Sequence, residues 1–218
     1  MNQFATKRTP VVAGVSDHSG WAILVCIAAN AGAPAVIDRR RVELIDHGLP
    51  KQPYEHDTLN LTAAAAEELV REVRESAVHS AERALSRLRS ELGAARELVS
   101  IALRTAPLPR LPSTVAEVHA SYSVTNRADA MLYHDALCTA ASSLGIGVTT
   151  FDRGREVPLA AEVLGATAAG VEQFLAGLRA TLGPPWQQDH RAAAARAIAA
   201  LGKHVAFRPA NVVKGQRR

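Results

Sequence analysis

Two short segments near opposite ends of the chain carry the side chains best suited to chemistry. The first, Asp17-His18-Ser19-Gly20, follows an apolar run and places a carboxylate at the end of a predicted strand. The second, WQQDH at residues 186–190, is held by Gly183-Pro184-Pro185 before a predicted helix. Carboxylates that converge on one point can bind a divalent cation, which prefers oxygen ligands. The candidate catalytic residues are Asp17, Asp189 and His190.

Both carboxylates also have simpler structural explanations, which the sequence leaves open. Asp17 could close a turn by accepting a hydrogen bond from the backbone two residues further on. Asp189 could lie in the first turn of a helix and complement its dipole. An acid at the end of a central strand, and an Asp-His pair after a rigid turn, favour a functional site.

Around these segments, the apolar pattern predicts a three-stranded meander over residues 10–16, 22–28 and 35–46. In the third strand the charged residues alternate between faces, which predicts an edge strand. Arg39 and Arg41 there could contact phosphates, and Trp186 could contact nucleic acid. A simpler role for the arginines is to protect the edge from pairing with another chain.

The rest of the chain alternates between helices and short apolar runs. Helices are predicted over residues 62–92, 114–144 with a bend near Asn126, 158–165, 168–182 and 186–202, and strands over 97–105 and 148–152. The order is β-β-β-α-β-α-β-α. It predicts an α/β protein with a mixed five-stranded sheet, in which the last two strands run parallel to the first and helices cover both faces.

Length and composition are consistent with one domain and exclude several classes of protein. We expect an N-terminal extension at residues 1–9, a single domain at 10–202 and a basic tail at 203–218. The net charge of +4 permits an anionic partner. Cys26 and Cys138 are too few for a disulfide framework, and no segment reads as a membrane span or a signal peptide. We therefore expect a cytoplasmic protein.

The element order and three segments resemble the ribonuclease H-like superfamily, and within it the single-domain bacterial Holliday-junction resolvases. The segments are GVSDHSGWAI, VIDRRRVELID and the terminal-helix sequence WQQDHRAAAARAIAAL with Asp189 near its start. The resemblance implies a nuclease in which carboxylates hold two Mg²⁺ or Mn²⁺ ions that promote phosphodiester cleavage.

The resemblance also implies where the metal ligands lie. Asp17 matches the acid of the first strand, Asp189 the acid of the last helix, and Glu67 or Glu68 the acid of the first long helix. An acid is expected at the end of the fourth strand, but Arg104 and Thr105 stand there. Asp152 or His190 could replace it. The candidate metal ligands are Asp17, Glu67, Glu68, Asp152 and Asp189.

Two functional hypotheses follow. The first is a divalent-metal-dependent nuclease acting on nucleic acid, which requires Asp17 and Asp189 to lie close together. The second is a catalytically degenerate scaffold or interaction domain of the same fold, which Arg104 and Thr105 favour. The small faces of the Ala-rich helices would suit close packing between subunits, so this hypothesis includes a homodimer.

Overall fold

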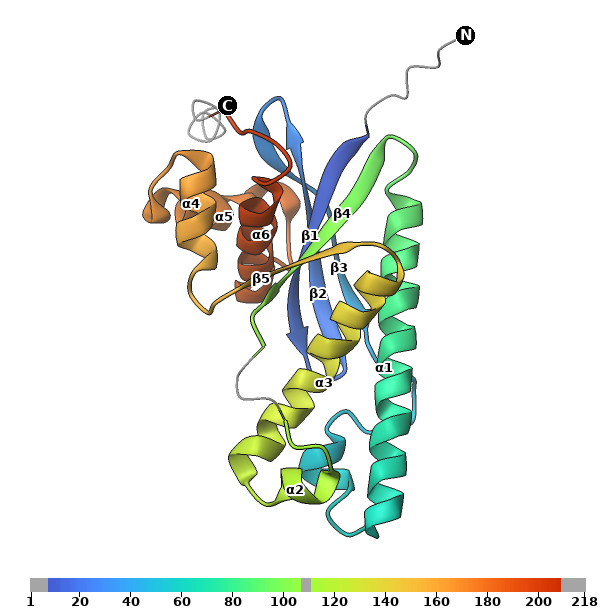
Figure 1. Cartoon of the computed structure of the whole chain (residues 1–218). Helices are drawn as coiled ribbons and strands as arrows, with labels where there is room; N and C mark the ends of the chain where they lie inside the picture. Colours follow the sequence, from blue (N-terminus) through green and yellow to red (C-terminus); the bar gives the residue numbers. More distant parts are fainter. Residues whose placement is uncertain (1–7, 107–110, 209–218) are drawn as a thin grey trace.

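The centre of the molecule is a mixed five-stranded sheet. The computed structural model describes residues 8–106 and 111–208. The strands are β1 (Thr9–His18), β2 (Trp21–Asn30), β3 (Ala33–Glu43), β4 (Arg96–Arg104) and β5 (Gly147–Phe151), in the order β3-β2-β1-β4-β5. The first three pair antiparallel, while β4 runs parallel to β1 and β5 parallel to β4 (Figure 1). The sequence predicts these strand directions and the edge position of β3, and the structure adds that β4 and β5 follow β1 in the sheet.

Helices cover both faces of this sheet, also as predicted. One side carries η1 (Pro53–Asp57), α1 (Ala63–Glu91), α2 (Val115–His119) and α3 (Tyr122–Ser143), and the other carries α4 (Glu156–Leu164), α5 (Ala168–Leu182) and α6 (Gln188–Leu201). Figure 1 shows α1 and α3 on one side of the strands and α4 to α6 on the other. The α/β class and the mixed sheet are therefore confirmed.

Side-chain alternation along β1 divides the interior into two cores. Val11, Ala13 and Val15 face α1 and α3, whereas Val12 faces α6. Successive residues of a strand point to opposite faces, so a buried central strand must be apolar throughout. This explains why the first segment is a continuous apolar run that ends near Asp17, at the C-terminal end of β1.

Helix α6 packs unusually close to β1, and this contact positions the candidate site. A Cβ atom added to Gly14 would lie 1.7 Å from the carbonyl oxygen of Ala193. Ala193, Ala194 and Ala197 are fully buried in the same contact. Small residues on both elements let the helix lie on the strand, so the first turn of α6 reaches the end of β1.

Two predicted elements differ from the observed ones. The predicted helix at 114–144 divides after His119 instead of bending near Asn126, because Ser121 begins a new helix in extended backbone. The segment at 47–60 contains the short helix η1, whose backbone amides at Tyr54 and Glu55 donate to the buried carboxylate of Asp129. Because Asp129 is far from η1 in the sequence, no local pattern predicts this contact.

The segment that follows α6 packs against the domain as far as residue 208. The backbone amide of Arg208 donates to the carbonyl of Gly32, and Phe207 packs against the α6 core. The first residues of the predicted tail therefore lie against the domain. The remaining tail from 209 and the predicted extension up to residue 7 lie outside the described residues. Within residues 8–106 and 111–208, no helix has the length and hydropathy needed to cross a membrane.

Candidate functional site

The two chemically suited segments of the sequence meet at one cavity of about 410 Å³. Asp17 at the end of β1 and Asp189 in the first turn of α6 both line it. The β1–β2 turn beside it depends on Gly20, whose φ of +82° favours glycine. The structure thus meets the condition of the nuclease hypothesis that Asp17 and Asp189 lie together.

Neighbouring side chains of β1 already contact both oxygens of the Asp189 carboxylate. The Ser16 hydroxyl donates to Oδ1 at 3.2 Å, and Nε2 of His18 lies 3.2 Å from Oδ2. These contacts fix the carboxylate against the end of the strand.

Arg196 lines the cavity and places a buried positive charge there. It lies two helical turns after Asp189, on the same face of α6, and is only 7 % exposed. Its Nη1 donates to the carbonyl of Val15 at 2.7 Å, and its Nη2 lies 3.6 Å from Oε1 of Glu156. Burial lowers the pKa of Arg196, and nearby carboxylates oppose that effect.

Glu156, like Arg153 and Arg196, lines the cavity and was missed by the sequence analysis. It begins α4, lines the cavity and has a side chain only 15 % exposed. Its Oε2 is buried and has no hydrogen-bond partner in the described residues. One sequence signal was available. Glu156 begins a helix shortly after β5, and the C-terminal ends of the parallel strands lie on the same side of the sheet as the starts of the helices that follow them.

Two further arginines line the cavity without any carboxylate partner. Arg104 ends β4, and Arg153 lies in the turn after β5. Within the described parts of the chain, neither side chain forms a hydrogen bond or ion pair. Since Arg196 faces Glu156, and Asp189 is held by Ser16 and His18, these two cations face only the carboxylate of Asp17. Arg104 and Arg153 are therefore the guanidinium groups of this cavity that are available to bind an anion.

The same arrangement does not fit a pair of divalent metal ions. Arg104 occupies the end of the strand where the resemblance implies an acid, and Arg196 adds a guanidinium that pairs with Glu156. Cations at these positions repel a metal ion. Over residues 8–106 and 111–208, no group of three or more His, Cys, Asp or Glu side chains is arranged to hold a metal.

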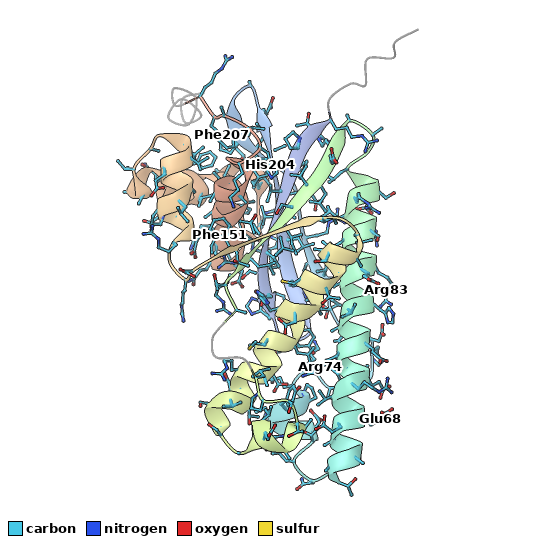
Figure 2. All side chains as sticks on the ribbon, viewed as in Figure 1. Glu68, Arg74, Arg83, Phe151, His204 and Phe207 are labelled. Atoms are coloured by element: carbon cyan, nitrogen blue, oxygen red, sulfur yellow. The ribbon has the colours of Figure 1, made fainter. Side chains whose placement is uncertain are left out.

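Three of the predicted metal ligands do not line this cavity. Glu67 accepts a hydrogen bond from the amide of Val115 at 2.6 Å, and Glu68 pairs with Arg71 on the surface of α1. Figure 2 shows Glu68 projecting outward near the first turns of α1. Asp152 is exposed, and its carbonyl accepts from the amide of Arg155 in a turn. The carboxylates of Glu67 and Glu68 therefore have local structural roles that their positions along the chain did not reveal.

Trp186 and His190 also need correction. Trp186 is 2 % exposed, and its Nε1 donates to the carbonyl of Leu175 at 2.6 Å, so it is a core residue and cannot contact nucleic acid. His190 is 5 % exposed and accepts a hydrogen bond from the amide of Gln187 through Nδ1. Burial lowers the pKa of His190. It closes the first turn of α6 and does not line the cavity of Asp17.

The two arginines predicted to contact phosphates have different surroundings. Arg39 donates to the carbonyls of four consecutive residues, Leu182 to Pro185, at 2.6–3.4 Å, and so holds the segment that precedes α6. Arg41 is half exposed, pairs with Glu43 and lies over the ring of Trp21. Arg41 is therefore the one of the two whose guanidinium can reach a ligand.

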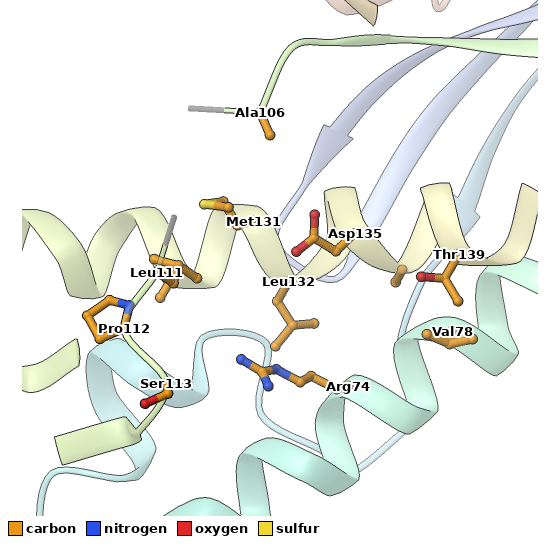
Figure 3. Close-up of a pocket in the computed structure, with 12 residues that line it drawn as sticks. Arg74, Val78, Ala106, Leu111, Pro112, Ser113, Met131, Leu132, Asp135 and Thr139 are labelled. Carbon is orange, nitrogen blue, oxygen red and sulfur yellow. The ribbon is translucent and has the colours of Figure 1, made fainter. Parts of the chain in front are cut away.

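A larger cavity, of about 660 Å³, lies between α1 and α3 (Figure 3). Its walls are mostly apolar, with Met131 and Leu132 among them, and Arg74 and Asp135 face it from α1 and α3. Arg74 already bonds the hydroxyl of Tyr54. This cavity lacks the convergent polar groups of the cavity at Asp17, so we place the functional site at the latter.

Comparison with solved structures finds matches of low sequence identity. One match is "T. thermophilus RuvC in complex with Holliday junction substrate", at 14 % identity over 89 % of this chain and 94 % of that chain, with a TM-score of 0.49. Another is "Thermus thermophilus RuvC structure", at 16 % identity over 89 % and 95 %, with a TM-score of 0.47. No family model and no curated protein matches.

The strand order decides the fold independently of these scores. The antiparallel β3-β2-β1 meander continues into parallel β4 and β5, with helices on both faces. The chain has the ribonuclease H-like fold. At such low identity and TM-score the two matches contribute nothing to the functional argument, which must come from the cavity itself.

Proposed function

We propose that this protein binds the phosphate backbone of nucleic acid at the cavity of Arg104 and Arg153, without a divalent metal ion. The observation that carries the proposal is that Arg104 and Arg153 line the cavity without a hydrogen bond or ion pair in the described residues, whereas Asp189 and Glu156 contact other side chains. Guanidinium groups present paired N–H donors that match the geometry of a phosphate. The exposed Arg41 at a neighbouring strand end extends the positive surface.

Nucleic acid is the phosphate ligand that fits the chain best. A cavity of about 410 Å³ at the C-terminal ends of β1 and β4 can admit a backbone segment, and the net charge of +4 favours polyanions. The buried Arg196 supplies at the floor of the cavity the positive charge that a metal would otherwise provide. In this proposal Glu156 positions Arg196, and the carboxylates of the cavity do not activate water.

Fluorescence anisotropy with labelled oligonucleotides in EDTA tests the proposal. The R104A/R153A variant should lose affinity for every nucleic acid tested. Its plot of log affinity against log salt should become shallower by about one unit per phosphate contact removed. R87A is the matched control, because Arg87 is an exposed arginine of α1 paired with Glu91. Equal binding by the wild type and R104A/R153A would refute the proposal.

A metal-dependent nuclease is the second candidate function, and the meeting of Asp17 with Asp189 favours it. Calorimetric titration of Mn²⁺ or Mg²⁺ separates the two candidates, with D17N as the control variant. Metal binding by the wild type that D17N abolishes would support the nuclease. We expect no binding at millimolar metal, because Arg104 and Arg196 repel the ion.

The predicted homodimer is a separate hypothesis, which sedimentation equilibrium at micromolar concentration tests.

A further inference from the structure

A stacked column of planar side chains crosses the sheet beside the proposed phosphate site. The rings of His18 and Trp21 lie parallel, with centroids 4.0 Å apart and an interplanar angle of 8°. Cζ of Arg41 lies 4.0 Å from the centroid of the Trp21 ring. A cavity of about 320 Å³ opens on this column, and Asp189 lines both it and the phosphate cavity.

Strand order shows how the column is assembled. β2 lies between β1 and β3, so His18 reaches Trp21 from one side and Arg41 from the other. His18 is anchored, because its Nε2 lies 3.2 Å from the carboxylate of Asp189. Trp21 is only partly buried, whereas Trp186 is in the core. Trp21 is thus the tryptophan whose ring can meet a ligand.

The cover on the outer face of Trp21 is weakly held. Arg41 is 49 % exposed, and its partner Glu43 is 55 % exposed. Exposed ion pairs and exposed cation–π contacts each contribute little. By contrast, the neighbouring Arg39 is fixed by the carbonyls of the segment before α6 and forms a rigid wall of the same cavity. A flat aromatic group can therefore replace the Arg41 guanidinium without disturbing the wall.

We propose, building on the function proposed above, that an unpaired nucleobase enters this cavity and stacks on Trp21 in place of Arg41. The adjacent phosphate would bind at Arg104 and Arg153, and the displaced Arg41 would contact the next phosphate. Bases of a duplex are already stacked and present no free face, so the preferred ligand is single-stranded or locally unpaired nucleic acid. Stacking accepts any base, so sequence preference should be weak.

Intrinsic fluorescence and anisotropy together test this inference in EDTA. A single-stranded oligothymidine should quench the emission of the wild type, and a duplex of equal length should not. W21F should lose the quenching, because the remaining Trp186 is buried, yet keep its affinity within about threefold, since phenylalanine also stacks. W21L should bind the single strand roughly 5- to 100-fold more weakly and leave duplex binding unchanged.

The outcomes separate this inference from the function on which it rests. Equal affinity for single strand and duplex, with W21L as tight as the wild type, would overturn base stacking but leave backbone binding intact. Absence of binding to any nucleic acid would overturn both. Retained emission of Trp186 and retained helical circular dichroism in W21F would show that the variant is folded, so a loss of quenching reports on Trp21 itself.

Discussion

Replacement of Arg196 by methionine tests most sharply whether a buried guanidinium takes the role of the metal. Methionine keeps much of the aliphatic volume but removes the bond to the carbonyl of Val15 and the partner of Glu156. Breaking a buried ion pair by removing one partner costs about 3–5 kcal/mol. The Nη2–Oε1 distance of 3.6 Å and the 15 % exposure of Glu156 place R196M at the lower end, so we expect about 3 kcal/mol.

Urea denaturation followed by circular dichroism measures this loss, and E156Q completes a double-mutant cycle. Glutamine removes the unpaired charge, so R196M/E156Q should be more stable than R196M, with a coupling free energy of about 1–3 kcal/mol. The unfolding midpoint of the wild type should not change in millimolar Mn²⁺, whereas R196M, in which Glu156 has lost its cationic partner, should be stabilised. A loss under about 1 kcal/mol in R196M, or no coupling, would refute the reasoning.

Three other predictions concern residues that hold the site or the fold. G14A should destabilise the protein by about 3 kcal/mol or more, measured by urea unfolding, because its Cβ would meet the carbonyl of Ala193. W186F should lose about 1–3 kcal/mol in the same assay, since the carbonyl of Leu175 loses its donor. Burial raises the pKa of Asp129 to about 6, so the folded state binds more protons than the unfolded state between about pH 4 and pH 6. Stability should therefore fall by at most about 3 kcal/mol as the pH rises through that window, and D129N should abolish the slope.

The sheet and most helices were predictable because their apolar patterns are local. The run at residues 168–182 matches α5 at both ends, since Thr167 caps its start and Gly183 follows its last turn. The alternating charges around Arg39 to Arg41 correctly predicted that β3 is an edge strand. The order of strands then restricted the topology to a few choices, because crossover connections between parallel strands have a fixed hand.

The candidate site was only partly predictable, because its contacts join distant parts of the chain. The turn at Asp17 and the start of α6 were identified, but their partners were not. Buried Trp186 donates to the carbonyl of Leu175, and Arg196 is held by Glu156 and by the carbonyl of Val15 in β1. The spacing of Arg196 two turns after Asp189 was visible, but it becomes informative only once α6 is placed against Gly14.

Binding measured beside cleavage tests the central claim most directly. A labelled single-stranded oligonucleotide is titrated with the wild type in EDTA and in Mn²⁺, and each sample is then run on a denaturing gel. The account predicts the same dissociation constant in both buffers and an intact strand, because Arg104, Arg153 and Arg196 supply the positive charge. Binding that requires Mn²⁺, or cleavage that D17N abolishes, would contradict it.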